Sequence, residues 1–380
     1  MIEFKLTDRE QEILAQARAE AAVGRTYARY FDKHEDEYEP PRDVKLASET
    51  SPRDVARAHP DDISGYNIVD VLVAIEEAWG DIALRNTHRG IGSMILASGG
   101  SQELQDRYFG KVLSIAMTEP GAGSDPSQMQ MVVGEDPQTG EWILNGEKVY
   151  VSGGGASDGV VVVAKVKDPD GRTTIGTFLV PKGTPGFHVL PQVRKMGNRG
   201  WDTVDYLFED CRVPAESRLF ADFKITMTAF NNTRPLVAAK GLGQARAALD
   251  FTREALERAG VDLDEEKPPL ERNAAAERFL KLEALYDASW LTLMRVKWIE
   301  DTDAGSKLGA AMCKAHGGMA VRRITQECIA LLGQTSITEA DMLEKWFRDA
   351  RLLDLWEGPG EIQRLIIARE LLGYGPRELS

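Results

Sequence analysis

The segment EWILNGEKVYVSGGG, residues 141–155, alternates apolar and polar side chains over much of its length. This two-residue period is typical of a β-strand with one buried face. Asn145 and Gly146 lie within it, and an Asn-Gly pair between alternating runs is a strong signal for a tight hairpin. We therefore expect a β-hairpin that turns at residues 145 and 146.

Two further β-rich runs follow this segment along the chain. GVVVVAKV (159–166) and GTFLVPKG (176–183) are bounded by glycine or proline, as strands commonly are. Together with the hairpin they predict a small all-β unit, a barrel or a sandwich, over residues 115–222.

Helical periodicity is found on both sides of the β unit. Near the N-terminus, Thr7 and Glu10 fit a capping box, and Gly24 is the expected end of the first helix. After the β unit, long helical runs, one of them closed by Gly260, should pack as a bundle. The sequence thus predicts a mainly α protein with a helical domain over 1–114, a β domain over 115–222 and a helical bundle over 223–380.

Composition argues against several classes of function. The formal net charge is -14, whereas phosphate binding requires clustered Lys and Arg, so nucleic acid is not an expected partner. No apolar run approaches membrane-spanning length, and the charged first residues lack the apolar core of a signal peptide. We expect a cytoplasmic protein without membrane association.

The cysteines and histidines do not form a metal-binding pattern. Cys211, Cys313 and Cys328 are scattered without a CxxC motif, and the five histidines lack HExxH-type spacing. We expect three packing cysteines, no disulfide framework and no metal.

The loop AMTEPGAGSD, residues 116–125, is a candidate ligand-binding turn. Gly121 and Gly123 would let the main chain approach a ligand closely, and Thr118 and Ser124 add hydroxyl groups. Successive N–H groups in such a turn can bind an anion or the edge of a heterocycle. The alternative is a tight surface turn, which is common for Pro-Gly segments.

A second candidate is LLDLWEGPGEIQRLIIAREL, residues 352–371. Glu357 precedes a Gly-Pro-Gly turn and an apolar helix, and Pro359 suits the first helical turn. The local alternative is an ordinary loop-to-helix junction, in which the carboxylate favours the helix dipole. A catalytic role for Glu357 would need a second motif elsewhere in the sequence that points to the same function.

Taken in order and spacing, the motifs resemble those of the acyl-CoA dehydrogenase family. The likeness covers the chain after about residue 66. The motifs that carry it are TEPGAGSD (118–125), LNGEKVYVSGGG (144–155), KMGNRGWDTVDYLFEDCRVP (195–214), FNNTRPLVAAKGLG (230–243) and RDARLLDLWEGPGEIQRLIIAREL (348–371). The resemblance implies an N-terminal helical domain, a middle β-barrel, a C-terminal four-helix bundle and an FAD cofactor in a cleft among them.

The resemblance also implies the reaction. Glu357 matches the base that removes an α-proton from an acyl-CoA thioester while a β-hydride passes to flavin N5, which gives a 2-enoyl-CoA. The thioester oxygen would be held by the main-chain N–H of Glu357 and a flavin ribityl hydroxyl. A desolvated carboxylate is a far stronger base than one in water, which suits the weakly acidic α-carbon.

The remaining site residues are carried over from the matching motifs. Tyr150 stands where the family usually has Trp, and Trp356 stands where it usually has Tyr. The implied FAD contacts are Met117, Thr118, Gly123, Ser124, Tyr150 and Ser152, and the implied substrate contacts are Ser124, Arg234, Trp356 and Gly358.

Two family motifs that reach the FAD of a neighbouring subunit are missing. LERAGVDLDEEKPP (256–269) lacks the expected Arg-Phe-Gly, and ECIALLGQTSITEAD (327–341) places Ala330 and Gln334 where a Gln and a Gly are usual. One hypothesis is an α2β2 assembly in which a non-identical partner donates these elements, as in some family members of bacterial steroid breakdown. The alternative is a homotetramer with substitute contacts from Arg258, Arg272 or Arg278.

Other functions remain open at this point. An acyl-CoA oxidase would share the flavin and the base, a nitroalkane oxidase would typically use Asp, and a scaffold subunit would have lost the chemistry. The family implies an electron-transfer flavoprotein as electron acceptor. The unusual segment over residues 32–66 suggests a wider entrance for a bulky or ring-bearing acyl group.

Overall fold

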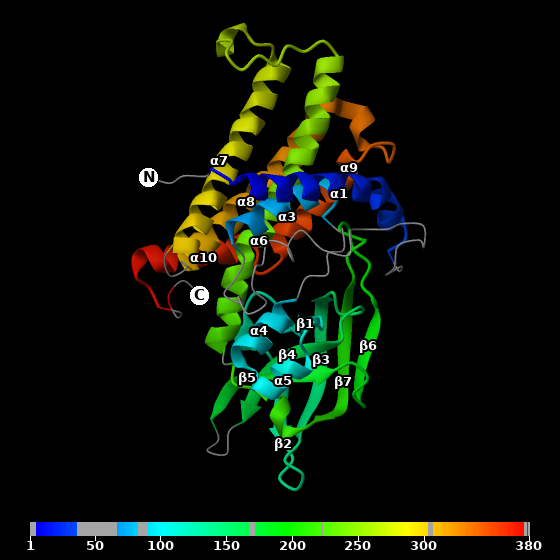
Figure 1. Cartoon of the computed structure of the whole chain (residues 1–380), viewed down its shortest axis with the longest axis vertical. Helices are drawn as coiled ribbons and strands as arrows, with labels where there is room; N and C mark the ends of the chain where they lie inside the picture. The colour runs from blue at the N-terminus through cyan, green and yellow to red at the C-terminus, as the bar shows by residue number, and fades with distance from the viewer. Residues whose placement is uncertain are drawn as a thin grey trace.

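The computed structural model describes residues 5–35, 67–82, 90–167, 172–221, 223–302, 307–375 and 378. Within them, a body of helices lies at one end of the molecule and a β domain at the other (Figure 1). Most of the segment with the suggested wider entrance, from residue 36 to residue 66, lies outside the described residues.

The N-terminal helices divide between these two bodies. They are α1 (Asp8–Lys33), α3 (Ile68–Gly80), α4 (Ile91–Gly99) and α5 (Gln102–Arg107). α1 packs on α3, whereas α4 and α5 cover the β domain, where Leu96 and Leu104 join a core with Val161 and Leu179 (Figure 1).

The first helix confirms one prediction and corrects another. Thr7 and Glu10 form the predicted capping box, in which the Glu10 carboxylate accepts a hydrogen bond from Thr7 N at 2.7 Å. The prediction that Gly24 ends the helix is wrong. Gly24 is buried within α1, because Ala28 and Phe31 continue the buried face, and this packing outweighs the weak helix propensity of glycine.

The middle region forms the expected β domain. Its strands are β1 (Leu113–Ala116), β2 (Val132–Glu135), β3 (Trp142–Ser152), β4 (Gly159–Lys167), β5 (Thr173–Pro181), β6 (Phe187–Gln192), β7 (Thr203–Val213) and β8 (Arg218–Leu219). The hydrogen-bonded order is β6-β7-β3-β2-β4-β5-β8, and β1 pairs in parallel with β4. Apolar side chains from these strands, among them Val160, Phe178 and Phe208, fill its core.

The hairpin predicted at residues 145 and 146 is wrong. β3 runs through both residues as one strand, and its register against β7 shifts between Leu144 and Gly146. The side chain of Asn145 accepts a hydrogen bond from Asp210 N at 2.7 Å, and both Gly146 and Asp210 have positive φ. The Asn-Gly pair therefore makes a β-bulge, which needs the same backbone freedom as a turn.

The C-terminal region is helical, as expected. It comprises α6 (Phe223–Arg258), α7 (Ala274–Thr302), α8 (Lys307–Leu332), α9 (Leu343–Leu355) and α10 (Gly360–Leu372), with short 3₁₀ turns at Pro269–Glu271 and Gly333–Ile337. α6 packs on α7, α8, α9 and also α3. Gly243 permits the α3 contact, because a Cβ there would lie 2.1 Å from Ile75 O. Gly260 follows α6 with φ +78°, which confirms it as the end of that helix.

All three cysteines are buried and unpaired. In the part of the chain that the structure describes, none of the helices combines the length and the apolar character needed to cross a membrane.

Candidate active site

Glu357 lies in the short connection between α9 and α10. Its φ is +54°, a value that few residues other than glycine adopt and that often marks a functional constraint. The Gln363 side chain donates hydrogen bonds to the carbonyls of Glu357 and Gly358, each at 3.1 Å. Gly358 has φ +94°, so this turn needs the conformational freedom of glycine. The connection is thereby held in one shape.

Among the described residues, the carboxyl group of Glu357 has one hydrogen-bond donor, which is neutral. Thr233 Oγ1, on α6, donates to Glu357 Oε2 at 2.7 Å. Burial raises the pKa of Glu357, and the Thr233 hydrogen bond and the charges of Arg234, Lys314 and Lys240 oppose this only in part. A carboxyl group with a raised pKa is a suitable proton acceptor near neutral pH.

The main-chain groups of Glu357 are differently engaged. Its carbonyl also accepts from Arg234 Nε at 3.3 Å, whereas its N–H donates to none of the residues described. Arg234 is buried, its guanidinium also donates to Asn231 Oδ1 at 2.5 Å, and burial lowers its pKa. The structure thus brings Arg234, Gly358 and Glu357 together.

Lys314 and Thr233 were not predicted from the sequence. Lys314, on α8, is fully buried, and its Nζ donates to Asp354 O at 2.6 Å. Burial lowers its pKa to about 8. Thr233 lies next to Arg234 in a motif already noted, so the sequence offered a signal for it. Lys314 lies in an Ala- and Gly-rich helix, and no sequence motif singles it out.

The 116–125 loop is anchored by a buried carboxylate. Glu119 is 6% exposed, accepts from Met131 N at 3.2 Å and pairs with Lys148 Nζ at 2.7 Å. Burial alone would raise the pKa of Glu119, but Lys148 and the N–H groups of Gln130 and Met131 outweigh burial and lower it. Burial lowers the pKa of Lys148 to about 8, against the opposing hydrogen bond and charge of Glu119.

Beyond this anchor the loop is open. Glu119 and Ala122 exchange two main-chain hydrogen bonds, whereas the N–H groups of Gly123 and Ser124 donate to none of the described residues. A Cβ added at Gly121 would meet no atom within 4 Å, and one at Gly123 would first meet Thr118 Cγ2 at 4.0 Å. Packing against the described residues therefore does not require either glycine, which fits a turn that a ligand approaches closely.

The same turn adjoins the end of β3. Thr118 O accepts from Val149 N at 2.9 Å, and Met117 O accepts from Lys148 Nζ at 3.1 Å. Tyr150 follows with φ +58° and 66% of its surface exposed. An exposed aromatic residue in this conformation is unusual and suggests a function.

Ser152 and Ser124 are exposed, as ligand contacts can be. The structure groups the predicted FAD contacts along one edge of the β domain.

The segment 201–203 lies between this edge and Trp356, the residue before Glu357. Thr203 pairs with Ser152, and Gly153 N donates to Asp202 O at 2.9 Å. Trp201 packs at an angle to Trp356, with ring centroids 6.4 Å apart. The sequence did not predict residues 201–203 as part of the site, but in the structure they contact both Ser152 and Gly153 at the end of β3 and Trp356 next to Glu357.

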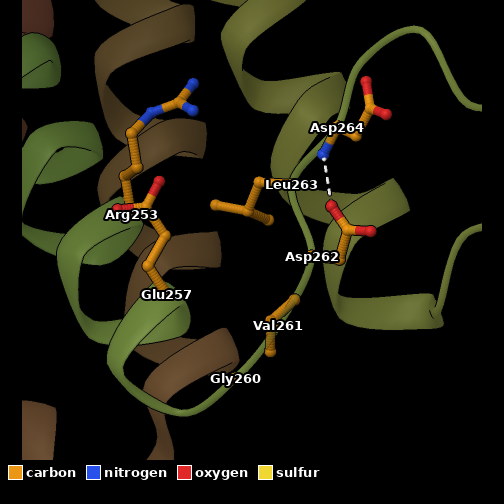
Figure 2. A pocket seen from close by; sticks show the side chains of 7 residues that line it. All are labelled: Arg253, Glu257, Gly260, Val261, Asp262, Leu263 and Asp264. Atoms are coloured by element: carbon orange, nitrogen blue, oxygen red, sulfur yellow. Dashed lines mark hydrogen bonds between the residues drawn. The ribbon is translucent and has the colours of Figure 1, made fainter.

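The region of the missing Arg-Phe-Gly motif forms an acidic hollow at the C-terminal end of α6 and the loop that follows it. It has a volume of about 530 Å³, and Figure 2 shows Glu257, Asp262 and Asp264 among its lining residues. Arg253 also lines it and pairs with Glu283 at 2.9 Å. This hollow therefore offers little to an anionic pyrophosphate.

The suggested substitute arginines are engaged within the chain. Arg258 Nε donates to Glu254 O at 3.2 Å, Arg272 pairs with Glu277 at 3.1 Å, and Arg278 pairs with Glu327 at 2.8 Å.

Comparisons with known proteins find related sequences over most of the chain. The sequence matches "Acyl-CoA dehydrogenase, middle domain" over residues 114–211 and "Acyl-CoA dehydrogenase, C-terminal domain" over residues 223–372. It is 31% identical over 306 residues to cyclohexane-1-carbonyl-CoA dehydrogenase of Syntrophus aciditrophicus, with 78% of each chain covered. It is 29% identical over 324 residues to acryloyl-CoA reductase (NADH) of Anaerotignum propionicum, with 81% of each covered.

A solved structure agrees with the fold. Butyryl-CoA dehydrogenase from Megasphaera elsdenii superposes with a TM-score of 0.80 at 22% identity, covering 98% of this chain and 100% of that one. N-terminal helices, a middle β domain and a C-terminal helical domain occur in the same order. The chain therefore belongs to the acyl-CoA dehydrogenase family of FAD-dependent oxidoreductases.

Proposed function

We propose that this chain catalyses the α,β-dehydrogenation of an acyl-CoA thioester to the 2-enoyl-CoA, with Glu357 as the base. The observation that carries the proposal is the environment of Glu357. Its carboxyl group is desolvated enough to raise its pKa, has one neutral donor and lies in a strained turn with an unengaged main-chain N–H. Such a carboxylate can accept a proton from a weakly acidic carbon.

The chain's own residues would carry out proton transfer and stabilise the charge that develops on the substrate. Glu357 takes the α-proton, and its N–H donates to the thioester oxygen, where negative charge develops as the C–H bond breaks. Arg234 and Gln363 hold the Glu357 carbonyl and so orient the peptide unit that it shares with Gly358. When bound, FAD supplies the two-electron oxidant that accepts the hydride from the β-carbon.

Residues of the β domain edge would hold the cofactor. The open turn at Gly123 and Ser124 offers unengaged N–H groups, and Thr118, Tyr150 and Ser152 lie along the same edge. These features support the proposed contacts of Met117 and Thr118 with the flavin, and of Ser124 with both flavin and substrate.

We further propose a bulky or ring-bearing acyl group, such as an alicyclic or polycyclic one. The indole of Trp356, the residue before Glu357, packs against that of Trp201, and the two rings offer an apolar surface. A relative whose name specifies a cyclohexane ring is consistent with this substrate class.

The assembly that completes the FAD site is a separate proposal. The acidic hollow and the engaged arginines support an α2β2 assembly, in which a non-identical partner supplies the pyrophosphate contacts. Purification of this chain alone, and again with the product of a neighbouring homologous gene, followed by flavin quantification, tests it. Full FAD occupancy in the lone chain would exclude the partner.

Anaerobic flavin bleaching tests the reaction itself. The flavin-loaded protein is mixed with butyryl-CoA, cyclohexane-1-carbonyl-CoA or a polycyclic acyl-CoA, and the loss of flavin absorbance is followed. Bleaching is expected, fastest with the ring-bearing substrates, and absence of bleaching by every acyl-CoA would favour a scaffold subunit. Peroxide formation in air separates an oxidase from a dehydrogenase, for which electron-transfer flavoprotein is the expected acceptor.

A further inference from the structure

The Thr233 hydroxyl lies between two hydrogen-bond acceptors. It is 2.7 Å from Glu357 Oε2 and 3.1 Å from the main-chain carbonyl of Phe230, one turn earlier on α6. Thr233 is 3% exposed, so water has little access to it. A hydroxyl has one proton to donate, so it can serve only one of the two acceptors at a time.

The charge of Glu357 decides between these acceptors. A carboxylate oxygen is a stronger acceptor than a peptide carbonyl and forms the shorter contact here. When Glu357 is ionised, the Thr233 proton therefore points to Oε2. When Glu357 is neutral, the proton can turn to the Phe230 carbonyl by rotation of the hydroxyl alone, so that it is never buried without an acceptor.

The two carboxyl oxygens of Glu357 are not equivalent. Oε2 accepts from Thr233, whereas Oε1 accepts from none of the described residues. An oxygen already engaged with a donor is the poorer base, because its lone pair is partly used. Oε1 is therefore the atom available to a proton on the substrate.

We propose that Thr233 is the positioning residue of the base: its hydroxyl holds Oε2 of the charged carboxylate, leaves Oε1 to take the α-proton, and turns to the Phe230 carbonyl once Glu357 is neutral. In this step the substrate C–H bond breaks, its electron pair stays on carbon, and an O–H bond forms at Oε1. The inference rests on the proposed function of Glu357.

The charged groups around Glu357 stay constant in the test. Arg234 and Lys240 face it from α6, and Lys314 faces it from α8, where Asp354 of α9 holds the Lys314 ammonium. Gln363 of α10 is neutral and contacts only main-chain oxygens. The hydroxyl of Thr233 contacts Glu357 Oε2 and the Phe230 carbonyl, so Thr233→Val removes one neutral donor from Glu357 and adds no charge.

The experiment compares Thr233→Val, which keeps the branched shape, with Thr233→Ser, which keeps the hydroxyl. Flavin reduction in the holoenzyme is followed anaerobically across pH with butyryl-CoA or cyclohexane-1-carbonyl-CoA, whichever reduces the parent faster. In Thr233→Val the rate of flavin reduction at pH 7 should fall about tenfold or more, because a hydrogen bond to the charged form of Glu357 is lost. The rate should recover in part at higher pH, where Glu357 ionises without that bond. Thr233→Ser should stay within about threefold of the parent.

A second readout needs no substrate. Infrared titration of the carboxyl band that disappears in Glu357→Gln gives the protonation midpoint of Glu357 directly. The midpoint should move to higher pH in Thr233→Val and stay at the parent's position in Thr233→Ser.

The outcomes separate the inference from the proposed function. The inference fails if Thr233→Val matches the parent in rate and midpoint, or if Thr233→Ser is as impaired as Thr233→Val. If no acyl-CoA reduces the parent but the midpoint moves in Thr233→Val alone, the coupling of hydroxyl and carboxylate stands and the proposed function fails. If the parent is reduced and no midpoint moves, the function stands and the inference fails.

Discussion

Glu119 and Glu357 both lie in irregular segments beside the proposed site, but their surroundings differ. Glu119 is paired with the buried Lys148 and accepts main-chain hydrogen bonds, and its pKa is lowered. Among the described residues Glu357 accepts from one hydroxyl, that of Thr233, and burial raises its pKa. A carboxylate satisfied on all sides fixes a loop, whereas one left short of donors keeps the capacity to take up a proton.

The same substitution should destabilise the protein at Glu119 and have little effect on its stability, or raise it, at Glu357. Glu119→Gln leaves Lys148 buried without its counter-ion, and breaking a buried ion pair in this way costs about 3–5 kcal/mol. Glu357→Gln removes a poorly solvated charge, so stability should stay within about 1 kcal/mol or rise. Chemical denaturation at pH 7 measures both, and a larger loss in Glu357→Gln than in Glu119→Gln would reverse the comparison.

The pH dependence of stability should also differ in sign. At Glu119 the folded pKa lies below the ordinary value of 4.5, so its stabilising contribution is present above that value and is lost as pH falls through the folded pKa. At Glu357 the folded pKa lies above 4.5, so ionisation costs stability as pH rises from there through the folded pKa.

Unfolding midpoints of the parent and the two glutamine variants, measured across pH, test this difference. The parent's advantage over Glu119→Gln should grow as pH rises to about 4.5 and then level off. The unfolding midpoint of the parent should fall relative to that of Glu357→Gln as pH rises further. If the unfolding midpoints of all three proteins changed with pH in parallel, the opposite pKa shifts assigned to Glu119 and Glu357 would be contradicted.

The smallest expected effect on stability concerns the turn that Glu119 anchors. Gly123→Ala places a methyl group where the chain leaves open space, so unfolding should be unchanged or about 0.4–1 kcal/mol more costly. FAD content should nevertheless fall, because the methyl occupies the space proposed for the ligand. Gly134→Ala in β2, also in open space, is the matched control, and equal FAD content in both variants would argue against this turn as the flavin contact.

The order of helical, β and helical regions could be predicted because hydrophobic periodicity is a local property. Local sequence signals gave wrong predictions where the same residues are compatible with two different backbone structures. Asn145 and Gly146 supply a bulge in place of a turn, since the partner Asp210 lies far along the chain. Gly24 stays helical because burial of neighbouring residues outweighs propensity.

Site residues within contiguous motifs could be predicted in the same way. The sequence predicted Glu357 and Arg234 as site residues, and in the structure a hydrogen bond joins them. It did not bring forward Lys314 or the contact of Trp201 with Trp356, because these depend on how α8 and the segment before β7 pack against the α9–α10 connection.

Flavin reduction by Glu357→Gln tests the central claim most directly. The flavin-loaded variant and the parent are mixed anaerobically with the best acyl-CoA substrate, and Glu361→Gln, an exposed carboxylate one turn further on, serves as control. Loss of the base should slow bleaching by about 10²–10⁴-fold while flavin content is kept and the control matches the parent. Bleaching by Glu357→Gln at the parent's rate would contradict the assignment of Glu357 as the base.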